Sequence, residues 1–154
     1  MVIKINWTYE EIIYTGNFFQ RLFKIGPKKK VEKPKLEVAA ILYDVSRKKQ
    51  VNLVYYGNLK TPGIIFDGDK TFEIDKQSFS DNYWLLFFAY TDDSLEGVKN
   101  ISINEKIINP KTKGSGIWIG SFGFSENKFI IENIPLNSKG ITENVLEISK
   151  KVVE

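Results

Sequence analysis

The chain has 154 residues, of which 42% are hydrophobic and 14% aromatic, and its formal net charge is +3. A chain of this length can bury a substantial core, and we expect residues 1–154 to form one domain. The sequence contains no cysteine and no histidine. These two absences exclude disulfide bonds, thiolate and imidazole zinc sites, cysteine nucleophiles and catalytic triads that need histidine.

Membrane-spanning and targeting segments are not expected. No stretch reaches 18 consecutive apolar residues, which is about the length needed to cross a bilayer. The first residues, MVIKINWTYEE, lack the order of basic, apolar and small residues that is typical of a signal peptide. We therefore expect the protein in the cytoplasm.

Short strands are predicted along most of the chain. Residues 2–7 alternate between apolar and polar, which indicates a half-buried strand. Residues 36–43 form a nearly continuous apolar run, as expected of a central strand covered on both faces. Further strands are predicted at residues 51–56, 64–66, 71–74, 83–90, 101–108, 117–122 and 128–132, with turns at 44–47, 67–69 and 124–127. This spacing favours a mainly β fold, an antiparallel β-sandwich.

The end of the chain follows a different period. Ile141, Val145, Ile148 and Val152 recur at three- and four-residue steps with charged residues between them. This pattern predicts an amphipathic C-terminal helix that covers a face or an edge of the sandwich.

The segment of about residues 9–35 fits the strand pattern least well and is predicted to be a helical or loop insertion. A short helix would place four apolar side chains on one side, those of Phe18, Phe19, Leu22 and Phe23, before Gly26-Pro27 ends it. Three lysines, Lys28, Lys29 and Lys30, follow at once. Two interpretations stay open. The aromatic side chains could pack on the sandwich as a lid above a solvated loop, or they could dock on a partner groove or an anionic membrane surface.

Residues 51–69, VNLVYYGNLKTPGIIFDGD, carry a resemblance to a known family. An aromatic pair, Tyr55-Tyr56, precedes Asn58-Leu59-Lys60-Thr61-Pro62 and a short loop that ends in Gly68-Asp69. This order resembles the most distinctive stretch of the TerD family of tellurium-resistance and bacterial stress proteins. Residues 36–42, 84–92 and 116–131 are similar to further strands of that family, in the same order.

The resemblance implies a β-sandwich that binds calcium through clustered carboxylates and has no defined enzymatic reaction. The family's Asp-Leu-Asp motif is here Lys35-Leu36-Glu37, and the acidic Gly-rich run after Gly-Asp is missing. Glu37, Asp67 and Asp69 are the residual candidates for calcium ligands. Calcium takes six to eight oxygen ligands, and the ammonium groups of Lys35 and Lys70 would repel it. We therefore expect calcium binding to be lost or weak, with no other cofactor. The two lysines could replace the metal by pairing with Glu37 and Asp69.

Three classes of function follow. The first is a non-catalytic binding or scaffold protein of a bacterial stress or defence complex, which contacts other proteins of that complex or a membrane surface. The second is a nucleic-acid-binding module that uses the basic residues of 28–35 and 47–49. The third is a hydrolase that uses carboxylate pairs such as Asp92-Asp93 or Asp67-Asp69. Adjacent acidic residues in turns are usually turn formers, so the first class is favoured.

Overall fold

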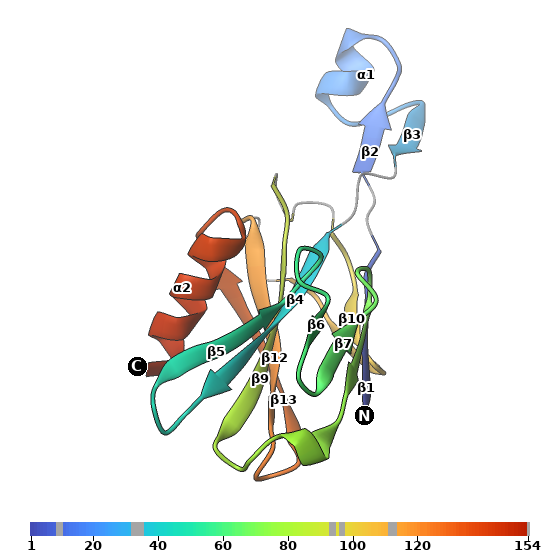
Figure 1. The fold of residues 1–154 in the computed structure, drawn as a ribbon. Coiled ribbons are helices and arrows are strands. Elements are labelled where there is room, and N and C mark those ends of the chain that lie inside the picture. Colours follow the sequence, from blue (N-terminus) through green and yellow to red (C-terminus); the bar gives the residue numbers. More distant parts are fainter. Residues whose placement is uncertain (9–10, 32–35, 93–94, 96–97, 111–113, 154) are drawn as a thin grey trace.

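The computed structural model describes residues 1–8, 11–31, 36–92, 95, 98–110 and 114–153. Two antiparallel sheets pack face to face, a C-terminal helix lies on one of them, and a hairpin arm projects from one end (Figure 1). The predicted mainly β sandwich with a C-terminal helix is therefore confirmed. The elements in chain order are β1 (Val2–Asn6), β2 (Glu11–Tyr14), α1 (Phe18–Leu22), β3 (Lys28–Val31), β4 (Glu37–Asp44), β5 (Lys49–Val54), β6 (Lys60–Thr61), β7 (Ile64–Phe66), β8 (Thr71–Ile74), η1 (Lys76–Ser78), β9 (Tyr83–Tyr90), β10 (Ile101–Ile103), β11 (Lys106–Ile108), β12 (Gly116–Gly123), β13 (Lys128–Leu136) and α2 (Ile141–Val153).

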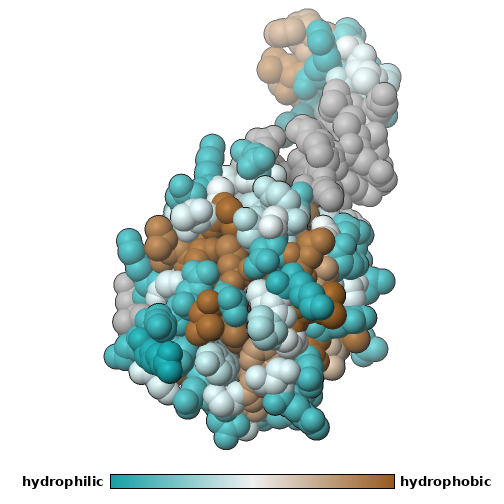
Figure 2. Space-filling model, viewed as in Figure 1, coloured by the Kyte–Doolittle hydropathy of each residue, from teal (hydrophilic) through white to brown (hydrophobic). Residues whose placement is uncertain are grey.

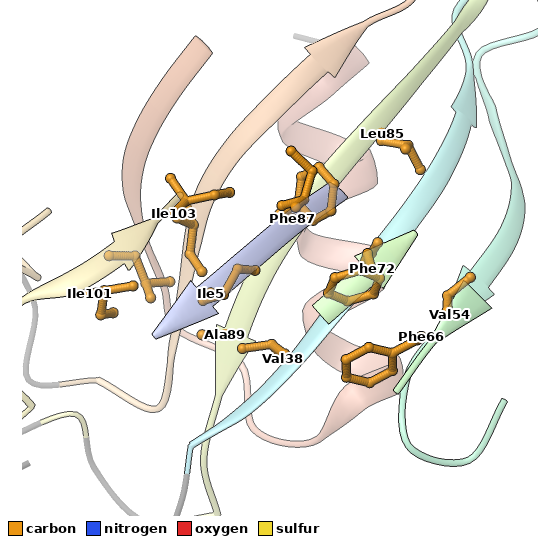
Figure 3. Packing of buried hydrophobic residues seen from close by; sticks show 14 of the residues in the cluster. Ile5, Val38, Val54, Phe66, Phe72, Leu85, Phe87, Ala89, Ile101 and Ile103 are labelled. Carbon is orange, nitrogen blue, oxygen red and sulfur yellow. The ribbon is translucent and has the colours of Figure 1, made fainter. Parts of the chain in front are cut away.

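The two sheets of the sandwich have different make-up. One has six strands in the order β11-β10-β1-β8-β7-β6, and the other has five in the order β13-β12-β9-β4-β5. The main core lies between them. Figure 3 shows Ile5 and Phe72, from β1 and β8 of the six-stranded sheet, beside Val38 and Phe87, from β4 and β9 of the other. This arrangement explains why the half-buried β1 alternates in sequence whereas β4 and β9 do not.

The central strands β4 and β9 are apolar on both faces because both faces are covered. Alternate residues of a strand point to opposite faces, and in β4 Val38 and Leu42 join the core between the sheets whereas Ile41 joins a second cluster. That second cluster includes Val145 and Ile148 of α2. The helix therefore covers the outer face of the five-stranded sheet, as its apolar stripe predicted.

One predicted strand is in fact a hairpin. Residues 101–108 form β10 and β11, joined by a two-residue turn at Asn104 and Glu105. Asn104 has a φ of 53°, a left-handed conformation that asparagine tolerates better than most residues. Its backbone N–H donates to the carbonyl of Lys4 at 2.8 Å. The isoleucines on both sides concealed this turn, because they are equally typical of one longer strand.

The predicted insertion is an arm built from β2, α1 and β3. The strands β2 and β3 pair antiparallel from Glu11 opposite Val31 to Tyr14 opposite Lys28, and α1 lies at the end of the hairpin that points away from the sandwich (Figure 1). Sequence patterns predicted the short helix but not the two strands. A basic strand such as β3 has no apolar alternation to mark it.

Candidate functional site

The tip of the arm is the most unusual surface of the described chain. We define the arm tip as residues 16–28, which lead from β2 through α1 into the start of β3. Asn17 caps α1 by accepting a hydrogen bond from the backbone N–H of Gln20 at 3.0 Å, and the Gln20 side chain accepts one from the N–H of Asn17 at 3.0 Å. This reciprocal capping box satisfies two donors at the helix N-terminus. The Thr15 N–H donates to the carbonyl of Pro27 at 2.8 Å and closes the loop.

The arm tip is held by a polar side chain on its inside. Gln20 lies between Gly16 and Gly26, where a Cβ on Gly16 would clash with the Gln20 Oε1 atom and one on Gly26 would meet its Cδ atom at 2.8 Å. Gly26 also has a φ of 80°, which favours glycine. The arm tip is thus ordered by glutamine, glycine and backbone contacts and does not need its apolar side chains for its own folding.

Those apolar side chains point into solvent. Between 55% and 68% of the surface of each is exposed, for Phe18, Phe19, Leu22, Phe23 and Ile25. The interpretation in which the aromatic residues form a lid on the sandwich is therefore wrong. Figure 2 shows brown and teal side chains together at the end of the arm. The physical reason is the β2–β3 ladder, which carries α1 away from the sheets.

Basic residues share this end of the arm. Five of the chain's 22 basic residues lie in residues 17–31 and none of its 19 acidic residues does, so the rest of the chain has 17 basic against 19 acidic residues. The side chains of Arg21, Lys24 and Lys28 are exposed. Lys29 and Lys30 belong to β3, and their side chains lie outside the described part. The sequence pattern marked the lysines from position 28 onward but not Arg21, Lys24 and Ile25, although Arg21 lies between Phe19 and Phe23 and the other two directly follow Phe23.

The carboxylates that resemble the calcium ligands of the TerD family are not gathered at one place. Glu37 opens β4 opposite Tyr90 of the five-stranded sheet. Asp67 and Asp69 lie in the turn between β7 and β8 of the six-stranded sheet. Among the described residues, no group of three or more acidic side chains is placed to hold a metal ion.

Asp67 instead organises its own turn. Its Oδ1 atom accepts hydrogen bonds from the backbone N–H groups of Asp69, Lys70 and Thr71 at 2.8, 2.8 and 3.0 Å. Partial burial alone would raise the pKa of Asp67, but the hydrogen bonds from Thr71, Asp69 and Lys70 outweigh it and hold this pKa below its ordinary value. A carboxyl that gives up its proton this readily is a poor general acid, and its Oδ1 atom already serves the three backbone donors of the turn.

Among the residues that the structure describes, no ion pair joins Lys70 to an acidic side chain. The Lys70 ammonium lies over the ring of Trp7, 5.0 Å from its centroid. The one ion pair of the described chain joins Arg47 to Asp44 at 3.5 Å. Lys70 lies near this ring because Trp7 directly follows β1, and the backbone N–H of Ile5 in β1 donates to the carbonyl of Lys70. Lys35 lies outside the described residues, and so does Asp93 of the pair Asp92-Asp93.

Tyr90 is a feature that sequence analysis missed. Its side chain is buried, and its hydroxyl has no hydrogen-bond partner among the described residues. Burial raises the pKa of Tyr90, and the nearby groups of Tyr56, Glu37, Tyr55 and Asp92 raise it further. Tyr55 packs against the second cluster, which contains Tyr90, and its ring meets that of the exposed Tyr56 edge to face at 5.2 Å.

The described parts of the two basic segments proposed for nucleic acid lie on different elements, and residues 32–35 of the first segment lie outside the described part. Residues 28–31 belong to the arm that precedes β4, whereas residues 45–48 form the turn after β4. The length of β4 between them is about 26 Å for eight residues of strand. Arg47 is also engaged, because its backbone N–H donates to Asp44 Oδ1 at 3.1 Å.

The turn at Asp67 gives a prediction about stability. Replacing Asp67 by alanine is expected to lower the free energy of unfolding by about 1 kcal/mol, since three backbone donors lose their acceptor. The lowered pKa makes this contribution complete above about pH 4, the ordinary range of an aspartate, and the contribution is lost as the pH falls through the folded-state value. Urea unfolding at several pH values checks both points.

The matched control for this prediction is Asp69→Ala, which changes an exposed side chain two residues away. It should leave stability within about 0.5 kcal/mol of the parent. Equal losses in the two variants, or a loss in Asp67→Ala that does not shrink in acid, would contradict the assigned role of Asp67.

The sequence was compared with known proteins. No protein-family model matches it, and no curated protein matches it either. None of the helices in the described ranges is long and apolar enough to cross a membrane.

Proposed function

We propose that this protein is a non-catalytic binding module in which the sandwich is a scaffold and the arm tip is the contact surface. The observation that carries the proposal is the exposure of all five apolar side chains of a well-ordered arm tip. Exposed apolar clusters of this kind mark interaction surfaces, because solvent contact with so much apolar surface is otherwise unfavourable. Contacts with other proteins or with a membrane surface both fall within this function.

The TerD-like character of the module is part of the proposal. It is supported by the Tyr55-Tyr56 to Gly68-Asp69 stretch and by the sandwich that carries it. A role in a bacterial stress or defence complex, such as resistance to tellurium, follows from that resemblance alone. A membrane-peripheral place in the cytoplasm belongs to the same proposal.

Calcium independence is proposed as well. The supporting observations are the separation of Glu37 from Asp67 and Asp69 onto different sheets and the use of Asp67 Oδ1 by three backbone donors. A ligand that binds only the folded state raises its melting temperature. We expect the same melting temperature in EDTA and in sub-millimolar calcium, as measured by circular dichroism. A rise of several degrees with calcium would overturn this part.

The function itself is tested in the native host. Extracts are separated by gradient centrifugation, and the distribution of the parent protein is compared with that of the variant Phe19→Ser/Phe23→Ser. We expect the parent in large assemblies or with membranes and the variant as free protein, because the variant lacks two exposed contact residues. Ile65→Ser/Ile107→Ser, which changes exposed residues of β7 and β11, is the matched control and should behave as the parent. Unchanged sedimentation of the arm variant would refute the proposed function.

A further inference from the structure

We propose that the arm tip inserts into the surface of an anionic phospholipid bilayer. This inference rests on the proposed function, and it names the partner. The apolar side chains of Phe18, Phe19, Leu22, Phe23 and Ile25 enter the boundary between headgroups and acyl chains. Arg21, Lys24 and Lys28 remain at the level of the lipid phosphates.

The positive charge of the arm favours an anionic partner. Residues 17–31 carry five basic and no acidic residues, whereas the rest of the chain has a small excess of acidic ones. The basic character is therefore local to the arm. An anionic membrane attracts such a segment and repels the remainder weakly, so the electrostatic field orients the protein with its arm toward the lipid.

The short length of α1 and the order of the residues after it favour a bilayer over a protein groove as the partner. A helix that binds in a groove presents anchors at positions i, i+3, i+4 and i+7, and α1 has only five residues. Its aromatic residues are instead followed within two positions by Lys24 and Ile25 and then by Lys28. Exposed apolar and basic residues alternate over this short loop. Such a pattern fits the surface of a bilayer, where apolar acyl chains lie directly beneath anionic headgroups.

The arm is long enough to reach the lipid without burying the sandwich. Four paired residues give the β2–β3 ladder a length of about 13 Å. Interfacial segments penetrate by roughly 5–10 Å. The sheets therefore stay in water while the arm tip is inserted. Because the capping box and Gln20 already fix the arm tip, insertion requires little ordering of the chain.

The experiment uses vesicles of phosphatidylcholine with and without phosphatidylglycerol, and measures binding of the full chain by flotation. The parent is expected to float with the anionic vesicles only, and to be released by high salt, because salt screens the charges. Phe19→Ser/Phe23→Ser should weaken the partition coefficient on the order of 100-fold. Arg21→Glu/Lys28→Glu should weaken it about 30-fold or more, from about fivefold for each basic residue.

Matched variants control for general effects of polarity and charge. Ile65→Ser/Ile107→Ser removes comparable exposed apolar surface from the sandwich, and Lys128→Glu/Lys139→Glu reverses two exposed charges there. Both variants should float with the anionic vesicles as the parent does, because neither changes a residue of the arm. The partition coefficient of the serine pair should lie within about threefold of the parent's value. Melting curves establish that each variant is folded.

A fluorescent label locates the inserted residues. The chain has no cysteine, so Phe19→Cys and Ile107→Cys each give one site for an environment-sensitive dye. Emission should rise and shift to the blue at position 19 on addition of anionic vesicles and stay constant at position 107.

Three results would overturn the membrane proposal. They are no flotation of the parent, equal flotation of the parent and the arm variants, or a dye response at position 107 without one at position 19. Preferential binding to single-stranded DNA with no flotation also counts against it. If flotation fails while the distribution in host extracts still depends on Phe19 and Phe23, the partner is a protein and the proposed function stands. If neither depends on the arm, both proposals fall.

Discussion

Replacing Phe72 by alanine is expected to lower the free energy of unfolding by about 3 to 5 kcal/mol. Phe72 is fully buried in β8 and joins the two sheets. Its ring stacks on Phe66 with centroids 4.2 Å apart, and it meets Phe87 of the facing sheet edge to face at 5.5 Å. Figure 3 shows the three rings together in the core. Truncation removes the central ring and leaves a cavity that rigid strands cannot close.

Urea unfolding followed by circular dichroism measures this loss. The free energy of unfolding of a domain of this size is about 5 to 15 kcal/mol. The variant should therefore keep a measurable folded population in buffer. Phe19→Ala is the matched control, because it truncates a phenylalanine in the same way but at the arm tip. The exposed fraction of Phe19 is 68%. It should change stability by less than about 0.5 kcal/mol. Similar losses in both variants would mean that the aromatic residues of the arm pack against the core.

Replacing Ile148 by alanine is expected to lower the free energy of unfolding by about 2 to 5 kcal/mol. Ile148 is fully buried where α2 meets the outer face of the five-stranded sheet. Trp118 and Leu136 belong to the same cluster. Loss of the isoleucine therefore weakens the attachment of the helix as well as the packing of the sheet. The same urea unfolding experiment gives the magnitude, and the total tryptophan emission, to which the buried Trp118 contributes, should shift to the red if the helix detaches.

Leu146→Ala is the control for this second prediction. Leu146 lies two residues away on the same helix and 57% of its surface is exposed. Its replacement should cost less than about 0.5 kcal/mol, because alanine is also a good helix former. A larger loss in Leu146→Ala than in Ile148→Ala would mean that the opposite side of α2 faces the protein.

The central strands and the C-terminal helix could be predicted because their patterns report burial directly. The continuous apolar run of β4 indicates cover on both faces, and that cover is supplied by the second sheet and by α2. The hairpin at Asn104 and the strands β2 and β3 could not be predicted. Asparagine is tolerated in a left-handed turn without being required there, and pairing between β2 and β3 depends on backbone groups more than on side-chain pattern.

The candidate site was only partly predictable for a related reason. Helical spacing places Phe18, Phe19, Leu22 and Phe23 near one another, but spacing alone does not say whether another element covers them. The same limit applies to Lys70, which the sequence places near Asp69 and the fold places over Trp7. The local sequence thus predicted which apolar residues of the arm tip lie together, but not whether another part of the protein covers them.

The sequence by itself determined which chemistry is absent, that the chain forms a sandwich with a terminal helix, and that an apolar segment adjoins a basic one. The tertiary structure decided that this segment leaves the sandwich on its own hairpin, with Gln20 inside and the aromatic side chains in solvent. The physical reason is that a hydrophobic pattern records which residues gain from leaving water. Which surface removes them from water depends on contacts between residues far apart in the chain, and for the arm tip no such contact forms within the described protein.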